Sequence, residues 1–290
     1  MSEVLSGYEI LDSTAIFPAG GNIACQGVKG AYSNLAARKM FTRGNYVFFK
    51  TFQGVADAVM SGFCDFGMLP IENNNHGSVK AVYQILEKGQ LNIVRSETML
   101  ITHQLLAKPG TKLEDIRRVY SHEQALGQCS GFLKSLGDQV RTMPCLNTAL
   151  AARHVAESEE RDIAAVSSPE CAQLYGLVPL ADHIADSDNN HTRFVCVSRK
   201  PVVYPGANRI SLILSVSHKP GSLYEVLGEF VRLGINMVKL ESTPVQGRDF
   251  EFRFYIDIEA STADEQVRQM LDRLKGMCPE FVFLGNYSVV

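Results

Sequence analysis

The stretch FEFRFYIDIE, residues 250–259, alternates apolar side chains with charged or tyrosine side chains. Successive side chains of a strand point to opposite faces, so this alternation predicts a β-strand with one buried face. Residues 210–216 alternate similarly, residues 235–244 and 281–289 are strand-like, and residues 223–231 and 267–274 carry apolar stripes at helical spacing. The order is therefore β-α-β-β-α-β, a ferredoxin-like arrangement. We expect two helices to cover one face of its sheet and the other face to be left to pair, a shape typical of regulatory or dimerisation domains.

The region before it alternates short apolar runs with helical patterns, which predicts an α/β fold with a largely parallel sheet. The clearest helical stripe spans residues 125–136, where apolar side chains recur at i, i+4, i+7, i+8 and i+11. The expected strands are residues 23–26, 46–51, 65–71, 91–94, 98–107, 118–121, 140–144, 162–167 and 192–198.

Proline and glycine indicate where the chain divides. Residues 1–21 show no sustained period and end in Pro-Ala-Gly-Gly, and the segment after residue 199 is again rich in proline and glycine. The sequence therefore predicts a lead-in segment at 1–21, an α/β domain at 22–199, a linker at 200–209 and a ferredoxin-like domain at 210–290.

The composition excludes several classes of protein. The chain has 290 residues, a net charge of −3 and 46% hydrophobic residues, which is typical of a folded globular protein. The absence of a Lys/Arg-rich run argues against nucleic acid or an anionic membrane surface as a partner. No apolar run reaches the roughly 18 residues of a membrane span, and no secretory signal is recognisable. The seven scattered cysteines indicate reduced thiols in a cytoplasmic protein.

Polar side chains stand at four predicted junctions between a strand and the next helix, at residues 27–33, 70–78, 120–124 and 147–149. The first N–H groups of a helix lack intrahelical acceptors and carry partial positive charge, which suits carboxylates. In open α/β sheets such junctions meet in one crevice. They predict a site for a small anionic ligand without naming the reaction. The histidines show no metal-ligand spacing, and the dinucleotide-binding fingerprint is incomplete.

The segment DSDNNHTRF, residues 186–194, runs directly into the last predicted strand of the α/β domain. Its motif Asn-x-Thr-Arg-Phe joins a glycine-rich start at 27–30, Pro-Ile-Glu-Asn at 70–73 and Ser-His-x-Gln at 121–124. In this order, and with the C-terminal domain, they resemble the prephenate dehydratase family over residues 22–290. The resemblance implies two subdomains of periplasmic-binding-protein type with the active site between them, followed by an ACT domain. It implies conversion of prephenate to phenylpyruvate, in L-phenylalanine biosynthesis, without a metal or organic cofactor.

The same resemblance assigns catalytic positions. The family's catalytic threonine matches Thr192, which would donate a hydrogen bond or a proton to the departing hydroxyl. Glu72 leaves two alternatives, a protonated carboxyl or a carboxylate that orients neighbouring donors, and we favour orientation. The other implied catalytic positions are Asn73, Ser121 and Gln128. The implied substrate-binding positions are Thr148, Arg193 and Phe194.

The resemblance to an ACT domain implies that L-phenylalanine binds there and lowers the activity. Gly221 would let the backbone approach the amino acid, and Ser222 stands near a helix start that can face its carboxylate. The implied effector-binding positions are Gly221, Ser222, Leu223, Asn236, Glu241 and Ser242. Such sites commonly form between two copies, so we expect a homodimer or a homotetramer.

Two departures and two alternatives remain. Thr243 stands where the family usually has arginine, which leaves the strength of the effector response open. Residues 1–21 are too few for the chorismate mutase domain that many relatives carry, so we expect a monofunctional enzyme. The alternatives are an arogenate dehydratase, which would use the same site on a substrate with an amino group, and a non-enzymatic phenylalanine-binding regulator. The matched residues at Thr192 and Asn73 argue against the regulator.

Overall fold

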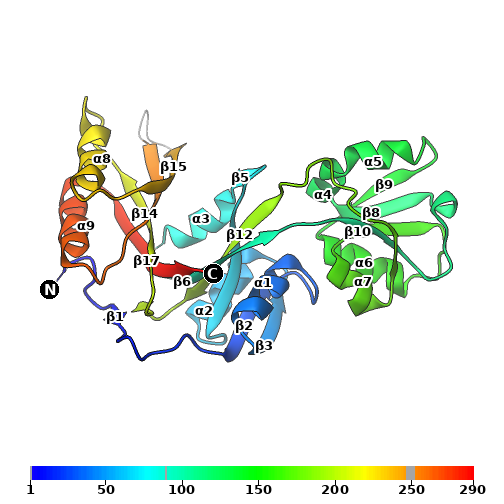
Figure 1. Cartoon of the computed structure of the whole chain (residues 1–290), viewed down its shortest axis with the longest axis horizontal. Helices are drawn as coiled ribbons and strands as arrows, with labels where there is room; N and C mark the ends of the chain where they lie inside the picture. Colours follow the sequence, from blue (N-terminus) through cyan, green and yellow to red (C-terminus); the bar gives the residue numbers. More distant parts are fainter. Residues whose placement is uncertain (1, 89, 246–251) are drawn as a thin grey trace.

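The computed structural model describes residues 2–88, 90–245 and 252–290. These residues form two α/β lobes and a C-terminal unit, arranged along the longest axis of the molecule (Figure 1). The first lobe lies in the middle, with the second lobe at one end and the C-terminal unit at the other. Strands β6 (Asn92–Leu100) and β12 (His191–Ser198) lead from the first lobe toward the second. The α/β fold with two subdomains agrees with the sequence prediction.

The first lobe has a mixed sheet that is covered on both faces. β3, β2 and β4 are parallel, whereas β12 lies antiparallel between β4 and β6. Ile23 and Cys25 of β2 pack under α1, and Ala24 between them packs under α2 and α3. The further elements are β2 (Gly20–Gln26), α1 (Tyr32–Met40), β3 (Arg43–Phe49), α2 (Phe52–Met60), β4 (Phe66–Asn73), β5 (Gly77–Ser78) and α3 (Lys80–Leu86).

The second lobe has a five-stranded sheet in the order β11-β7-β10-β8-β9. β9, β8 and β10 are parallel, and β7 is antiparallel to both of its neighbours. The predicted parallel arrangement therefore holds for three strands of each lobe, and within the lobe the other strands pair in antiparallel orientation. Its elements are β7 (Gln104–Ala107), the 3-10 turn η1 (Leu113–Asp115), β8 (Arg118–His122), α4 (Glu123–Gln128), α5 (Ser130–Ser135), β9 (Arg141–Cys145), α6 (Thr148–Glu157), β10 (Ile163–Ser167), α7 (Pro169–Tyr175) and β11 (Val178–Ala181).

Two segments that the sequence predicts as continuous are divided in the structure. The expected strand 98–107 is two strands, β6 and β7, because residues 101–103 carry the chain from one lobe to the other. The expected helix 125–136 breaks at Cys129 into α4 and α5. Gly127 and Gly131 flank the break, and glycine weakens a helix interior. The apolar stripe itself is correct, because Ala125, Cys129 and Leu133 are buried in one cluster.

The C-terminal unit has the predicted β-α-β-β-α-β order, with strands arranged β15-β16-β14-β17. The alternating stretch forms β16, although its first two residues, 250 and 251, lie outside the described residues. Helices α8 and α9 pack on one face, where Leu212, Phe230 and Leu271 share a core. The elements are β14 (Arg209–Ser215), α8 (Ser222–Arg232), β15 (Met237–Pro244), β16 (Phe252–Ile258), α9 (Glu265–Met277) and β17 (Phe281–Val289).

The second face of this C-terminal sheet packs against the first lobe. Tyr255 of β16 stacks on Tyr83 of α3 with ring centroids 4.1 Å apart, and Ile213 and Tyr287 join the same core. β17 also pairs in parallel with β6, so the two sheets are continuous. The sequence leaves this face to pair, and in the structure its partner is α3 of the same chain. The face is mixed, because Ile213 and Tyr255 alternate with Ser211 and Asp257, whereas the fully apolar face of the strands covers α8 and α9.

The lead-in segment and the linker both contain ordered strands. β1 (Glu9–Ile10) pairs in parallel with β13 (Val202–Val203), two strands too short to recognise in the sequence. Ser2 Oγ donates a 2.8 Å hydrogen bond to Asp272 of α9, and Tyr8 Oη hydrogen-bonds Asn92 of the first lobe. The N-terminal segment thus joins the C-terminal unit to the first lobe. The domain boundaries proposed from the sequence stay predictions.

Two further observations concern the sequence expectations. All seven cysteines are free, and only Cys145 is not fully buried. Among the described residues, no helix combines the length and the apolar character that crossing a bilayer requires.

Candidate active site

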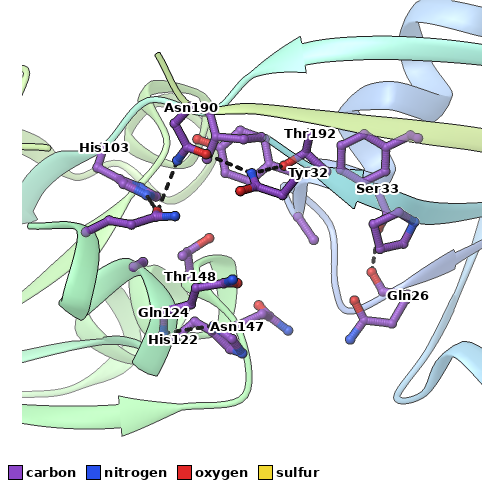
Figure 2. A pocket seen from close by; sticks show the side chains of 17 residues that line it. Gln26, Tyr32, Ser33, His103, His122, Gln124, Asn147, Thr148, Asn190 and Thr192 are labelled. Atoms are coloured by element: carbon purple, nitrogen blue, oxygen red, sulfur yellow. Dashed lines mark hydrogen bonds between the residues drawn. The ribbon is translucent and has the colours of Figure 1, made fainter. Parts of the chain in front are cut away.

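A cleft of about 720 Å³, counted with its open mouth, lies between the two lobes. Figure 2 shows side chains of both lobes around it. All four predicted junctions contribute: Tyr32 and Ser33 begin α1, Asn73 ends β4, Gln124 lies in α4 and Thr148 begins α6. The prediction that these junctions meet in one crevice is confirmed.

Asn73 and Thr192 face each other at the first-lobe side of the cleft. They are register partners on the antiparallel strands β4 and β12. Asn73 Nδ2 lies 2.9 Å from Thr192 Oγ1, 2.8 Å from Asn190 Oδ1 and 3.0 Å from the carbonyl oxygen of His191. Asn73 Oδ1 accepts hydrogen bonds from the N–H groups of Asn75 and His76. The amide is thus fixed at both ends.

A chain of hydrogen bonds carries this geometry to the second lobe (Figure 2). Asn190 Nδ2 donates to Gln128 Oε1 over 3.0 Å, and His103 Nε2 lies 3.0 Å from the same oxygen. An amide oxygen only accepts, so Nε2 of His103 carries the proton. Burial lowers the pKa of His103, and although the bond to Gln128 opposes this effect, the pKa stays below the ordinary histidine value. The imidazole is therefore neutral at pH 7.

Among the residues that the structure describes, no Lys, Arg, Asp or Glu side chain lines the cleft. The donors that these residues offer to an anion are hydroxyls, amides, imidazoles and the N–H groups at the starts of α1 and α6. Asn147 Oδ1 caps α6 by accepting from Leu150 N over 2.8 Å. The remaining lining residues are Gln26, Ala31, Pro70, Ile101, His122, Ala125 and Phe194. Among the described residues, no group of three or more His, Cys, Asp or Glu is placed to hold a metal ion.

Five of the eight catalytic and substrate-binding positions named from the sequence line the cleft, and three do not. Thr192, Asn73, Gln128, Thr148 and Phe194 line it. Ser121 is fully buried beneath it, and its Oγ donates a 2.6 Å hydrogen bond to the carbonyl oxygen of Val166, which ties β8 to β10. Its hydroxyl is directed to a neighbouring strand and is not available to a ligand in the cleft.

Glu72 and Arg193 lie on the opposite face of the strand pair from the cleft. Arg193 Nε is 2.8 Å from Glu72 Oε1, and Lys239 Nζ is 2.7 Å from Glu72 Oε2. Burial raises the pKa of Glu72, but the charges of Arg193 and Lys239 outweigh burial and hold the pKa below its usual value. Glu72 is therefore ionised, which excludes the protonated alternative. The placement also corrects the assignment of Arg193 as a substrate contact.

Two polar residues that join the two sides of the cleft have no assignment from the sequence. His103 lies in a segment predicted as one continuous strand, where the polar triplet Thr-His-Gln at 102–104 interrupts two apolar runs and was the available signal. Asn190 begins the Asn-x-Thr-Arg-Phe motif, but its side chain was given no role although it bridges Asn73 and Gln128.

The structure separates the predicted effector positions into two groups. Gly221, Ser222 and Leu223 line a second cavity at the start of α8, together with Phe252 and Phe254. Asn236, Glu241 and Ser242 lie outside that cavity. Asn236 Nδ2 donates to Glu259 Oε2 over 2.9 Å, Glu241 contacts Ser78 and Lys239, and Ser242 is exposed on β15.

Sequence comparisons identify the family of the chain. A family profile described as prephenate dehydratase matches residues 23–202. Arogenate dehydratase/prephenate dehydratase 2, chloroplastic, of Arabidopsis thaliana is 37% identical over 279 residues, a match that covers 92% of this chain and 72% of that protein.

Solved structures show the same fold. The prephenate dehydratase of Arthrobacter aurescens, in complex with L-Phe, is 29% identical with a TM-score of 0.82, covering 92% of this chain and 89% of that one. GqqA, described as a novel type of quorum quenching acylase, is 32% identical with a TM-score of 0.82, covering 93% and 98%. From the profile match and the Arabidopsis relative, together with the cleft motifs, it follows that the chain belongs to the prephenate dehydratase family.

Proposed function

We propose that this chain is a prephenate dehydratase, which converts prephenate to phenylpyruvate, water and carbon dioxide in L-phenylalanine biosynthesis. The observation that carries the proposal is the hydrogen bond from Asn73 Nδ2 to Thr192 Oγ1 inside the interlobe cleft. Because Oγ1 accepts this bond, the hydroxyl proton of Thr192 is free to point at a ligand. A donor of this kind is what a departing hydroxide needs.

The reaction depends on positioning more than on a strong acid. The bond between the ring and its carboxylate breaks and leaves its electron pair in the ring, while the ring C–O bond breaks with its pair on oxygen. That oxygen takes up a proton and leaves as water, and the ring becomes aromatic, which supplies the driving force. Threonine is a weak acid, so the fixed orientation of Thr192 by Asn73 should contribute much of the acceleration.

The neutral lining suits the two carboxylates of prephenate. Helix starts supply N–H donors at Tyr32 and Thr148, and an N-terminal helix dipole favours negative charge. Phe194 and Ile101 add apolar walls for the ring.

The lining also favours prephenate over arogenate. Arogenate carries an ammonium group where prephenate has a keto oxygen, and an ammonium is best paired with a carboxylate. The described part of the chain places no Asp or Glu side chain in the cleft lining, whereas it supplies several amide and hydroxyl donors for a keto oxygen. We therefore expect a higher kcat/KM for prephenate, although the Arabidopsis relative is named for both activities.

The C-terminal unit we assign to the ACT class, as the binding site of L-phenylalanine. The second cavity, the predicted residues Gly221, Ser222 and Leu223 that line it, and the L-Phe complex of the Arthrobacter relative support this assignment. Feedback inhibition, assembly into a homodimer or homotetramer and a cytoplasmic location belong to the same proposal.

A single assay series tests these proposals. The purified chain is incubated with prephenate or arogenate, with and without L-phenylalanine, and phenylpyruvate is followed by its ultraviolet absorbance in alkali. Turnover of prephenate that phenylalanine suppresses is the expected result. Preference for arogenate would overturn the substrate assignment. No turnover of either substrate, with phenylalanine still raising the melting temperature, would favour the non-enzymatic regulator instead.

A further inference from the structure

The strand pair that carries the proposed catalytic residues also faces the C-terminal unit. Its register places Thr192 opposite Asn73 and Arg193 opposite Glu72. Side chains alternate along a strand, so the first pair faces the cleft and the second pair faces the C-terminal sheet. A displacement of Arg193 therefore acts on the backbone of Thr192 through a single peptide bond.

Three strands of the C-terminal sheet hold the guanidinium of Arg193. Nη2 donates to Asp257 Oδ2 of β16, and Nη1 donates to Tyr287 Oη of β17 over 3.0 Å. Ser211 of β14 donates to Asp257 Oδ1 over 2.5 Å and lies 2.7 Å from Tyr287 Oη, which fixes both partners. The side chains of Arg193 and Asp257 are only 7% and 3% exposed.

The fourth strand reaches the same network through Glu72. Lys239 of β15 places Nζ 2.7 Å from Glu72 Oε2 and 2.6 Å from Ser78 Oγ of β5. Glu72 in turn contacts Arg193, so every strand of the C-terminal sheet supplies one polar side chain to this cluster. The cluster consists of Arg193, Glu72, Asp257, Tyr287, Ser211 and Lys239.

A buried ion pair is a poor source of stability, because desolvation offsets most of its attraction. The ion pair instead fixes the position of the side chain, since the planar guanidinium donates hydrogen bonds only along its N–H directions. We propose that Arg193 is a positioning residue, through which the C-terminal sheet holds Thr192 and Asn73 in the geometry needed for dehydration. This inference rests on the proposed function and deepens it.

A second ion pair between the same two units provides a matched control. Arg253 Nη1 of β16 lies 2.8 Å from Glu87 Oε2, and Tyr255 Oη donates to Glu87 Oε1 over 2.7 Å. Glu87 follows the last residue of α3 and lies on neither β4 nor β12. Glu87→Gln therefore weakens the contact between the units without touching the strand pair behind the cleft.

The test compares four variants of the full chain by kcat, KM and melting temperature. Tyr287→Phe removes one partner of Arg193 and should lower kcat about 3–10-fold, and Asp257→Asn about 10–100-fold, with KM changed less than about twofold, as expected for lost orientation. Arg193→Lys keeps the charge but loses the planar fork, and should lower kcat as Asp257→Asn does. Glu87→Gln should lower the melting temperature but keep kcat within about twofold of the wild type.

The inference is overturned if Tyr287→Phe and Asp257→Asn keep wild-type kcat. It is also overturned if Glu87→Gln loses as much kcat as these variants do for the same fall in melting temperature. Tyr287→Phe retains the buried ring, so the test holds even if Asp257→Asn does not fold. Hydrogen exchange at residues 71–75 and 190–194 gives a readout independent of turnover. Faster exchange there in Tyr287→Phe, and not in Glu87→Gln, supports the inference even if the wild type turns over neither substrate, and equal exchange contradicts it.

Discussion

Asn73 and Thr192 lie opposite each other on β4 and β12, and a single 2.9 Å hydrogen bond joins the amide of one to the hydroxyl of the other. The amide cannot rotate without losing the bonds that its oxygen accepts from Asn75 N and His76 N. Thr192 Oγ1 therefore has a defined acceptor direction, which leaves its own proton for another partner. In the proposed mechanism that partner is the departing hydroxyl of the substrate.

Thr192→Val tests the donor directly. Valine is nearly isosteric, so the strand pair should persist while the hydroxyl is lost. We expect kcat to fall by roughly 10²–10⁴-fold, the range for a positioned acid. The measurement is steady-state turnover of prephenate together with the melting temperature.

The control for this change is Thr142→Val on β9. Thr142 is exposed and lies outside the cleft lining, so the same atoms are removed at a distance from the proposed chemistry. Its kcat should stay within about twofold of the wild type, as for most exposed substitutions. A folded Thr192→Val protein with near-normal turnover would remove Thr192 from the mechanism.

Asn73→Asp separates the two ends of the amide. The new carboxylate still accepts from Asn75 N and His76 N, so the turn after β4 is kept, but the donor to Thr192 Oγ1 is gone. A negative charge also enters a cleft proposed to bind a dianion. We expect kcat/KM to fall at least about 100-fold at pH 7 and to recover in part as the pH is lowered toward the carboxyl pKa. A flat pH profile of the ratio to wild type would contradict this reading.

The sequence is informative wherever a pattern has a single spatial meaning. Alternation in residues 252–258 and 210–215 correctly predicts two strands of the C-terminal sheet, because only a β-strand places every second side chain on the same face. Helix starts at residues 32 and 148 correctly predict residues of the cleft, because each helix begins at the carboxyl end of a strand; that the two strands belong to different sheets, one on each side of the cleft, is not visible in the pattern.

What the sequence misses depends on direction and on contacts between distant segments. Neighbouring motif residues point to opposite sides of a strand pair, so Glu72 and Arg193 were assigned to the cleft although they face the C-terminal sheet. Ser121 was assigned from its motif, yet its hydroxyl is satisfied by Val166 on another strand. What covers the second face of the C-terminal sheet could not be predicted, because a face that mixes Ile213 and Tyr255 with polar side chains does not say whether a second copy or α3 covers it.

His103 should make stability depend on pH in a defined direction. Burial holds its pKa below the ordinary value of about 6.5, so between these two values the unfolded chain binds more protons than the folded one. Stability therefore rises with pH across this window and is lost as the pH falls below about 6.5. His103→Gln should reduce the difference in melting temperature between about pH 7.5 and pH 5.5. The control His154→Gln removes an exposed imidazole on α6 and should keep the wild-type difference in melting temperature. If His103→Gln also keeps that difference, His103 is not its cause.

Thr243→Arg tests whether the departure from the family pattern limits the effector response. Thr243 lies on β15 opposite Arg253 of β16. If the L-phenylalanine carboxylate is bound near this strand pair, a guanidinium adds a charge-assisted hydrogen bond. The concentration of L-phenylalanine that gives half-inhibition should then fall about tenfold, which corresponds to about 1.4 kcal/mol. Thr243→Gln adds a long polar side chain without charge and should change the half-inhibition concentration less than about threefold, since a neutral hydrogen bond contributes less to binding than a charged one. Equal responses in the two variants would place the effector carboxylate elsewhere.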